Sequence, residues 1–263
     1  MKSSKILVRI NNLNEIEEYK KLGITNFLFP LEGFSIGYET FKLEDLQNLN
    51  ENIYLLVNRI LDNKDIDKFK KIVPSLSFIK GLIFEDLGIY EVLNKSNIPL
   101  IWNQNHFAVN TLSINIWLDK VSSVVISNEL EKSELIYLLN NVKKKVILPV
   151  FGLNMAMYSR RSLLSFYNEY KNLKTIKKGI LKTNNDKEFI AVENNYGTVL
   201  FYKEYFNLIN EISNFNDDNI LFYYVDPNMI DIKDIKKVLN GEKDYQNPFY
   251  ENKTVYRIGD LND

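Results

Sequence analysis

Eight short apolar runs, separated by amphipathic stretches, repeat along nearly the whole 263-residue chain. Each run is a continuous series of aliphatic, β-branched or aromatic residues, which is typical of strands that are covered on both faces. No linker rich in Pro, Gly or Ser interrupts the alternation, so we expect one domain over residues 1–263. The expected strands cover residues 5–10, 26–31, 52–59, 78–86, 99–105, 122–129, 144–152 and 219–226.

The number of repeats favours a closed barrel over an open sheet. Eight strand–helix units in about 250 residues are typical of a (β/α)8 barrel, whereas open parallel sheets usually contain fewer strands. Residues 188–191 and 197–201 flank a turn at residues 194–197, which predicts a small β-hairpin beside the exit of the seventh strand. The sequence therefore predicts an α/β fold: a TIM-like (β/α)8 barrel, complete or slightly irregular, with a hairpin insertion.

Polar residues follow nearly every expected strand, and in such a barrel the ligand site lies where the strands end. These residues could perform acid–base chemistry, hold a hard divalent cation such as Mg²⁺, or only hydrate the rim, as loops do in any soluble protein. No spacing motif marks a metal site, so we assign no metal ligands and leave a divalent cation open. The residues are Asn11, Asn12, Glu32, Asn58, Arg59, Glu85, Asp86, Asn103, Asn105, His106, Ser127, Glu129, Asn154, Asp226 and Asn228.

The segment after the seventh strand combines Gly152, several hydroxyls and two adjacent arginines, and we expect it to form a loop that meets a ligand. Arg160 and Arg161 can bind a phosphate or carboxylate through planar guanidinium groups, although one of the two could instead form a salt bridge within the fold. His106 is the only histidine, so any serine–histidine catalysis depends on it. The alternative for His106 is a hydrogen-bonded structural role.

Basic residues are concentrated in one sector of the chain. Between Lys143 and Lys187 there are eleven basic residues and two acidic ones, whereas the whole chain has a formal net charge of -1. This sector predicts binding of RNA or of a phosphorylated or carboxylated small molecule, although a coding bias towards lysine explains part of the excess. Interspersed aromatic residues favour single-stranded RNA. Against this, we expect Leu163, Leu164, Tyr167 and Tyr170 to form one buried helical stripe.

The chain contains no cysteine, which excludes disulfides, thiolate metal sites, thiol nucleophiles and cysteine-ligated clusters. No apolar run reaches the roughly 18 residues of a membrane span, and the first residues become polar too soon for a signal peptide. We therefore expect a cytoplasmic protein with no membrane partner. Phosphate-binding glycine fingerprints are also missing, which disfavours nucleotide-dependent chemistry.

Six segments resemble, in order and spacing, peptidase family U32, which comprises collagenase-like peptidases and RNA-modifying relatives. The resemblance implies the same barrel, with Asn105, Asn110, Glu129, Arg160, Arg161 and Glu193 lining or bracing its pocket. We take Glu129, Glu193 and His106 as candidate catalytic residues, and Asn105, Asn110, Arg160 and Arg161 as candidate substrate-binding residues. The segments are GLIFEDLGIYEVL (81–93), IPLIWNQNHFAVN (98–110), VVISNELEKSELIYLL (124–139), PVFGLNMAMYSRRSLLSFY (149–167), AVENNYGTVL (191–200) and TVYRIG (254–259).

The resemblance also implies a cofactor that this chain cannot hold by itself. Several relatives support hydroxylation of RNA or of a quinone precursor and commonly bind an iron–sulfur cluster on four cysteines, but this chain has Ser162 where many have a cysteine. Three functions therefore stay open. The protein could support RNA modification without its own cluster, it could be a peptidase, or it could be a non-catalytic partner of a cysteine-bearing paralogue.

Overall fold

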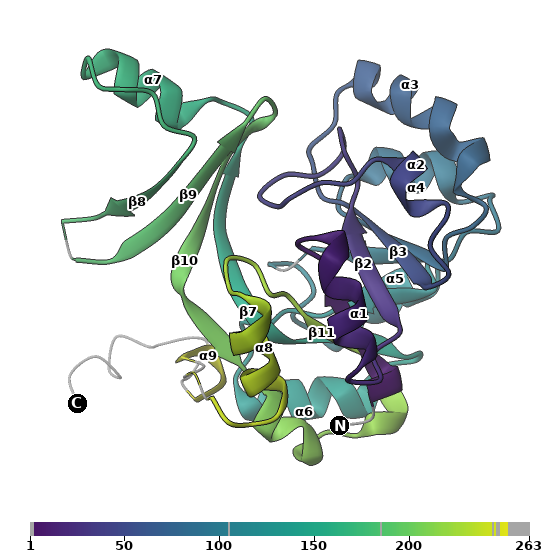
Figure 1. Cartoon of the computed structure of the whole chain (residues 1–263). Helices are drawn as coiled ribbons and strands as arrows, with labels where there is room; N and C mark the ends of the chain where they lie inside the picture. Colours follow the sequence, from purple (N-terminus) through teal and green to yellow (C-terminus); the bar gives the residue numbers. More distant parts are fainter. Residues whose placement is uncertain (1–2, 105, 185, 244, 246–247, 252–263) are drawn as a thin grey trace.

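The computed structural model describes residues 3–104, 106–184, 186–243, 245 and 248–251. Its centre is a ring of eight parallel strands in the order β11-β1-β2-β3-β4-β5-β6-β7, which the pairing of β7 with β11 closes (Figure 1). This confirms the predicted (β/α)8 barrel, with additional strands bonded outside it. The barrel strands are β1 (Ile6–Arg9), β2 (Asn26–Pro30), β3 (Asn52–Val57), β4 (Gly81–Phe84), β5 (Leu100–Asn103), β6 (Ser123–Val125), β7 (Val146–Ser159) and β11 (Ile220–Val225).

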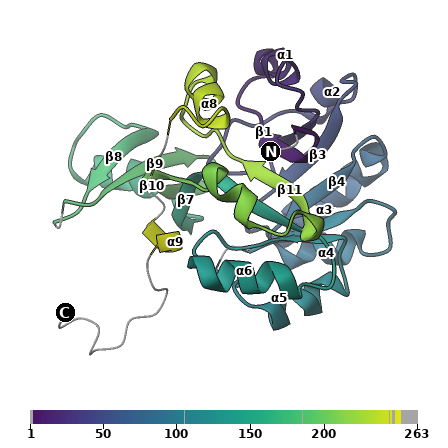
Figure 2. The ribbon, with the colours of Figure 1, turned by 90° about the horizontal axis from the view of Figure 1, so that it is seen from below.

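Helices follow the barrel strands and cover the outside of the ring (Figure 2). Aspartate or asparagine side chains cap the first turns of several of them, for example Asp62 before α3 and Asp86 before α4. None of the helices in the described residues is long and apolar enough to cross a membrane. The helices are α1 (Ile16–Lys20), α2 (Leu43–Leu46), α3 (Asn63–Ile72), α4 (Leu87–Leu93), α5 (Thr111–Leu118), α6 (Lys132–Asn141), α7 (Leu163–Tyr170), α8 (Ile232–Leu239) and α9 (Pro248–Glu251).

The barrel interior is filled by one layer of apolar side chains, to which every barrel strand contributes one residue. These residues are Leu7, Leu28, Leu56, Ile83, Ile101, Val125, Ile147 and Phe222. Because side chains alternate along a strand, the residues two positions further along face the same interior, nearer the carboxyl ends of the strands. That second layer is largely polar and comprises Arg9, Pro30, Asn58, Glu85, Asn103, Ser127, Pro149 and Tyr224. The alternation thus places a polar floor directly above a closed apolar plug.

Strand β7 is much longer than the sequence predicted. It continues through Gly152 to Ser159, so the expected ligand-binding loop after Gly152 is wrong. The continuation exists because β10 (Gly197–Asn207) pairs with it in antiparallel fashion. The pair is irregular on either side of Phe201, where extra residues on one strand bend the ribbon.

The predicted hairpin is confirmed and belongs to a larger extension of the sheet. Strand β9 (Glu188–Asn194) pairs with β10, and β8 (Lys178–Lys182) pairs with β9. Figure 2 shows this extension on one side of the barrel. It packs against the loop after β2 through a small apolar cluster that includes Ile36, Leu153 and Phe201. The extension therefore forms a wall beside the carboxyl ends of the barrel strands.

A lobe that includes α7 and β8 projects away from the barrel (Figure 1). It comprises residues 161–184, 186 and 187. The expected buried stripe on α7 is wrong, because only Leu164 is buried, whereas Leu163, Tyr167 and Tyr170 are 37%, 54% and 80% exposed. No second layer lies over the outer side of this helix among the described residues in Figure 1, so periodic apolar positions there stay in contact with solvent.

Candidate functional site

A cavity of about 280 Å³ opens at the mouth of the barrel, between the polar floor and the wall formed by β7. Its position at the carboxyl ends of the strands is the usual place for a ligand site in this architecture. The lining residues are Tyr38, Ile60, Glu85, Asn103, Gln104, His106, Val125, Asn128, Pro149, Phe151, Leu153, Asn154, Met155, Ala156, Met157, Tyr158, Phe206, Tyr224 and Asp226. Several of these residues were predicted from their positions at strand ends, namely Glu85, Asn103, His106, Asn154 and Asp226.

Arg9 anchors the floor of the cavity and is completely buried. Its Nε donates to Asp226 Oδ1 at 2.6 Å, and its Nη2 donates to Asn11 Oδ1 at 2.8 Å. The guanidinium also lies 4.5 Å from the centre of the Tyr38 ring. Asp226 is able to approach closely because Gly152 lies against it, where an added Cβ would come within 3.0 Å of the Asp226 Cβ. The ion pair is therefore built into the packing of the floor, and its charges largely cancel.

Glu85 is the unusual ionisable group of the mouth. Burial raises the pKa of its carboxyl group to about 8, against one opposing hydrogen bond that Asn103 Nδ2 donates to Glu85 Oε1 at 3.0 Å. A carboxyl group with a single donor and no adjacent cation is more stable as the neutral acid in a buried place. Glu85 is therefore protonated at neutral pH, and it can donate a hydrogen bond as well as accept one.

The two tyrosines of the floor are also uncharged. Burial, followed by the nearby Asp226 carboxylate, raises the pKa of both Tyr38 and Tyr224 well above the usual phenol range. On the wall, Asn128 Nδ2 donates to Asn154 Oδ1. The cavity consequently presents hydroxyls, amides and one neutral carboxylic acid. His106 and the Arg9-paired carboxylate of Asp226 also line it, together with aromatic and methionine side chains.

His106 and Glu129, two of the predicted catalytic residues, lie together at the rim. His106 Nδ1 is 3.3 Å from Glu129 Oε2, and the imidazole side chain is 60% exposed. The Glu129 backbone N–H donates to Ser127 Oγ, which fixes the start of the following loop. The pair can hold a proton at the edge of the cavity, where His106 is a lining residue. Whether it takes part in catalysis stays a prediction.

Glu193 lies outside the mouth, at the junction between the extension and the lobe. Its Oε2 accepts from the backbone N–H groups of Leu164 and Ser165 at 2.8 and 3.2 Å, so it caps the first turn of α7. Burial alone would raise its pKa, but donation from Lys177, Ser165 and Thr198 outweighs burial and lowers the pKa to about 2. These contacts give Glu193 a structural role. It does not line the mouth cavity but a separate one with Lys177 and Tyr196, and its catalytic role stays a prediction.

Three of the four predicted substrate-binding residues can be placed. Asn110 caps helix α5 by accepting from the Ser113 N–H at 2.9 Å. Arg161 begins the lobe, is exposed, and forms no side-chain ion pair within the described residues. Asn105 lies outside the described residues. Of the group, only Arg161 offers a free cation for a ligand.

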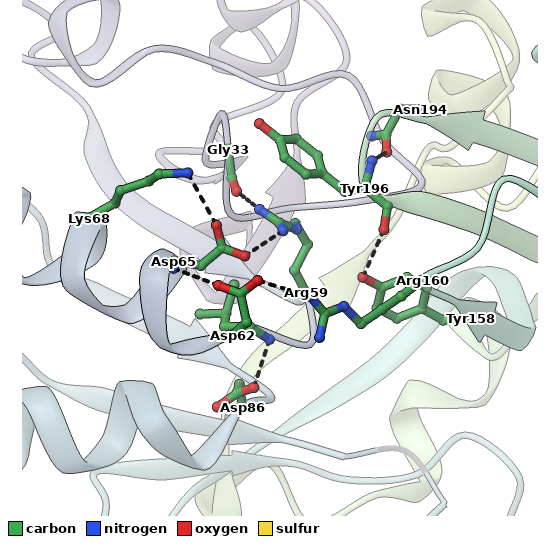
Figure 3. Close-up of polar contacts among 11 residues, drawn as sticks. Gly33, Arg59, Asp62, Asp65, Lys68, Asp86, Tyr158, Arg160, Asn194 and Tyr196 are labelled. Atoms are coloured by element: carbon green, nitrogen blue, oxygen red, sulfur yellow. Dashed lines mark hydrogen bonds and ion pairs between the residues drawn. The ribbon is translucent and has the colours of Figure 1, made fainter.

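Arg160 belongs to a clamp that holds the tip of the extension against the barrel (Figure 3). Its Nη2 donates to Asp62 Oδ2 at 3.2 Å. Next to it, the Arg59 guanidinium lies 3.6 Å from the centre of the Tyr196 ring, and Arg59 Nη2 donates to Asp65 Oδ2 at 2.8 Å. We expected that one of the two arginines could form a salt bridge within the fold, and Arg160 forms it.

The chain has no cysteine, so an iron–sulfur cluster on thiolates has no ligand here. Within the described part of the chain, no group of three His, Asp or Glu side chains is placed to hold a metal ion. A divalent cation held by fewer protein ligands stays a prediction. The buried Arg9 and the amides Gln104 and Asn128 were not among the predicted site residues, and Glu85 was predicted at a strand end but not as a neutral acid. Counting two positions beyond the apolar interior residue Leu7 would have indicated Arg9.

Comparison with known proteins places the chain in a family. The family model described as peptidase family U32 matches residues 36–258. The chain is 22% identical over 184 residues to the tRNA hydroxylation protein P2 of Bacillus subtilis (strain 168), in an alignment covering 65% of this chain and 60% of that protein. The chain therefore spans less than two thirds of that relative's length.

A solved structure, the spore cortex-lytic enzyme SleL of Bacillus cereus, is similar over 91% of this chain and 74% of its own. Its TM-score of 0.45 and sequence identity of 9% are too low to carry an argument about fold or function. The family match covers well over half of the sequence, from the loop after β2 to the C-terminal segment. On this match and the closed barrel together, the chain belongs to peptidase family U32.

Proposed function

We propose that this protein supports modification of RNA, of the hydroxylation type, by holding the RNA on its projecting lobe without an iron–sulfur cluster of its own. The observation that carries the proposal is the surface of the lobe, which combines cations with exposed aromatic rings. Basic grooves with stacking faces bind single-stranded RNA, because phosphates meet the cations and bases stack on the rings. The proposal places the protein in the cytoplasm.

The cations of the lobe are available to a ligand. Lys174, Lys178 and Lys187 are exposed and form no ion pair within the described residues, as is also true of Arg161. Lys171 lies over the Tyr170 ring, with Nζ 5.3 Å from the ring centre. By contrast, the barrel mouth has no lysine or arginine among the described residues that line it. Polyanion binding therefore belongs to the lobe.

The aromatic residues of the lobe are unusually exposed for a folded protein. Phe166 is 59% exposed, Tyr167 is 54% exposed and Tyr170 is 80% exposed, and all three lie on helix α7. Several large apolar side chains exposed on one short helix are typical of an interaction site. Stacking of bases on such rings contributes about 1–3 kcal/mol per base.

The similarity to the tRNA hydroxylation protein P2 supports the same function. Because the identity is low and the chain spans only part of that relative, the RNA species and the modified nucleoside are left to experiment. Mass spectrometry of total RNA nucleosides from a strain lacking this protein tests the reaction. We expect loss of one hydroxylated nucleoside, and an unchanged nucleoside profile would contradict the proposal.

RNA binding itself is tested by fluorescence anisotropy with a short single-stranded RNA over a series of salt concentrations. Removal of three phosphate contacts by combining Lys174→Ala, Lys178→Ala and Lys187→Ala should weaken binding at low salt. It should also reduce the slope of log K against log salt by about 2. The matched control combines Lys143→Ala, Lys144→Ala and Lys145→Ala, which remove equal charge before β7, at the opposite end of the barrel. Equal weakening by both triple variants would show non-specific attraction and contradict a site on the lobe.

Peptide hydrolysis is a second candidate, favoured by the His106–Glu129 pair at the rim of the mouth. Such a pair could activate water, alone or with a divalent cation. Purified protein should then cleave gelatin or casein, and EDTA should stop the cleavage if a cation takes part. Inactivity of the metal-loaded protein would remove this candidate.

A partner role beside a cysteine-bearing paralogue is a third candidate. It is favoured by aliphatic residues of the lobe, since Leu173, Ile176 and Ile180 are exposed together with the aromatic rings. Co-expression with the paralogue should yield a stable complex that the Phe166→Ser and Ile180→Ser changes disrupt. Separate elution of the two chains would contradict this role.

A further inference from the structure

We infer that the barrel mouth receives one uncharged, planar, hydrogen-bonding ring, namely a nucleobase extruded from the RNA strand that the lobe holds. This inference rests on the proposed function and adds to it where the base goes and which side chains recognise it. Enzymes that act on a base commonly take it out of the stack and read its polar edge in an enclosed pocket.

The size of the cavity fits a single ring system. Its volume of about 280 Å³ lies just below the range for small-molecule sites, which is roughly 300–1,000 Å³. A ligand of this size is small, and the charge of the lining decides which part of a nucleotide can enter. The mouth therefore suits one base, with the sugar and phosphate left outside.

The charges of the lining exclude an anionic ligand. None of the described residues that line the cavity is a lysine or an arginine. The nearest buried cation, Arg9, donates to Asp226, to Asn11 and to the Ile10 carbonyl oxygen, so its hydrogen-bonding groups face protein partners. A phosphate or carboxylate would lose its hydration in the mouth and meet no free cation in return. The phosphate of that nucleotide must therefore stay outside the mouth, and the lobe can bind phosphates further along the RNA strand.

The polar groups of the floor match the edge of a base, which places donors and acceptors side by side. Asn103 Nδ2 and the neutral Glu85 supply donors, and the Gln104 side chain is held beside them by donation to the Glu85 carbonyl oxygen at 3.3 Å. Within the described residues, Glu85 has no side-chain hydrogen bond other than the one from Asn103. Its second oxygen is thus left for a ligand, and an amide-like edge is the neutral group that pairs with a carboxylic acid in two directions.

The walls of the cavity provide apolar faces for a flat ring. The partly exposed Tyr38 and Tyr158 contribute aromatic surface, and Met155 and Met157 contribute polarisable sulfur that adapts to a ring. A wall of this kind packs favourably against the ring of a base but makes no favourable contact with a hydrated ion. The lining thus combines stacking faces with a polar floor, as pockets for flipped bases do.

Strand β7 connects the mouth with the lobe. Asn154, Met155 and Met157 line the cavity, and the same strand ends at Ser159, two residues before Arg161. At about 3.3 Å per residue, roughly 23 Å separates Asn154 from Arg161 along the strand. An RNA strand that follows β7 can therefore place one base in the mouth and its phosphates beside the lobe cations.

Binding of a base in the mouth should depend on pH, because Glu85 titrates there. The groups around it from the neighbouring strands and loops are Asn103, Gln104, Tyr38, Tyr224, His106, the Arg9–Asp226 pair and, in a small neighbouring cavity, Arg59 and Asp86. Arg59 is paired with Asp65, and Asp86 caps α4. The tyrosines stay neutral in this range, whereas Glu85 loses its proton as the pH rises through about 8. Binding of a neutral ring should then weaken, because the donor is lost and a buried charge appears.

The experiment is saturation-transfer NMR and calorimetry of the whole chain with uridine, cytidine, adenosine and guanosine as separate probes. We expect at least one nucleoside to bind with a Kd on the order of 1 mM, as suits one ring in a small pocket. Orotate, a pyrimidine that carries a carboxylate, should bind at least about tenfold more weakly than the best nucleoside, since the carboxylate finds no cation. Between about pH 7 and about pH 9, nucleoside binding should fall by roughly tenfold.

Two variants separate recognition from folding. Glu85→Ala should abolish nucleoside binding, whereas Glu85→Gln, which keeps a neutral donor, should bind within about threefold of the natural chain and lose the pH dependence. The matched control is Glu91→Ala, an exposed carboxylate on α4. If no nucleoside binds while the lobe still binds RNA, the mouth inference is overturned and the proposed function survives. Loss of RNA binding by the lobe as well would instead overturn the proposed function.

Discussion

The barrel mouth holds a partly buried glutamate and the base of the lobe holds a buried one, and the two places shift the glutamate pKa in opposite directions. At the mouth, Glu85 has one amide donor, and burial raises its pKa to about 8. At the base of the lobe, Glu193 has Lys177, two helix N–H groups and two hydroxyls around it, and its pKa falls to about 2. Burial acts on both carboxyl groups, so the number of donors decides the charge.

This difference distinguishes a carboxylate that stabilises the fold from a carboxylate that can bind a ligand. Every oxygen of Glu193 accepts from protein donors, so no lone pair is left for a ligand. Glu85 lines a cavity and keeps one oxygen without a protein partner in the described residues. A residue that is satisfied stabilises the fold, and a residue that is left partly unsatisfied at a cavity is available for recognition.

The largest effect is expected for Glu193→Ala. Removing the carboxylate leaves the first N–H groups of α7 and the Lys177 ammonium without their acceptor, which should cost about 4 kcal/mol of unfolding free energy. Urea unfolding measures the loss, and hydrogen exchange should show lower protection in α7 with little change in the barrel. Glu188→Ala, which removes the exposed partner of Lys203, is the control. Uniform loss of protection over the whole chain would contradict a local brace.

The contribution of Glu193 to the free energy of unfolding depends on pH in a defined direction. Because the folded pKa of Glu193 lies below its value of 4.5 without partners, its contribution is complete above about pH 4.5 and is lost as the pH falls towards 2. For Glu85 the sign is reversed, since its folded pKa is raised. The folded protein retains the proton that the unfolded chain releases, so stability falls as the pH rises from about 4.5 to about 8.

A smaller effect of opposite direction is expected for Glu85→Gln. Replacing a carboxyl group that must stay protonated by a neutral amide should raise the unfolding free energy by up to about 3 kcal/mol at pH 7. The gain should vanish near pH 4.5, where Glu85 is protonated in both states. Urea unfolding at several pH values measures it. A gain in stability that is independent of pH would mean that packing, and not ionisation, causes the difference between glutamate and glutamine at position 85.

The smallest effect is expected for Lys177→Met, which removes the one cation that pairs with Glu193. The lysine side chain is 56% exposed, so solvent screens the pair and the loss should stay below about 1 kcal/mol. Lys203→Met, which removes the exposed partner of Glu188, is the matched control for lysine replacement in the same sheet. A loss as large as that of Glu193→Ala would show that the ammonium, rather than the helix N–H groups, holds the carboxylate.

Much of the barrel could be predicted from the sequence because each strand is a continuous apolar run that only a doubly covered sheet can bury. The length of β7 could not, since Gly152 looks like an end, and only pairing with the distant β10 continues the strand. The apolar spacing of α7 was misleading for a related reason. Periodicity shows that one face is apolar, but it cannot show whether the fold supplies a layer to cover that face.

The site was predictable in its position but not in its chemistry. Asp226 and His106, both predicted at strand ends, line the mouth cavity, whereas the protonation of Glu85 depends on burial by residues far away in the sequence. Glu193 looked like a site residue because it lies in a segment shared with the family. Its role depends on the approach of α7, which local sequence does not encode.

The direct test of this account is an NMR titration of the glutamate side-chain carboxyl carbons, with Glu85→Gln and Glu193→Gln used to assign the two signals. We expect Glu85 to titrate near pH 8 and Glu193 to stay ionised down to about pH 2. With that result, the mouth is neutral at physiological pH and the charges that attract RNA belong to the lobe. Titration of Glu85 near its ordinary value of 4.5 would place a negative charge in the mouth and contradict the division of roles between the two regions.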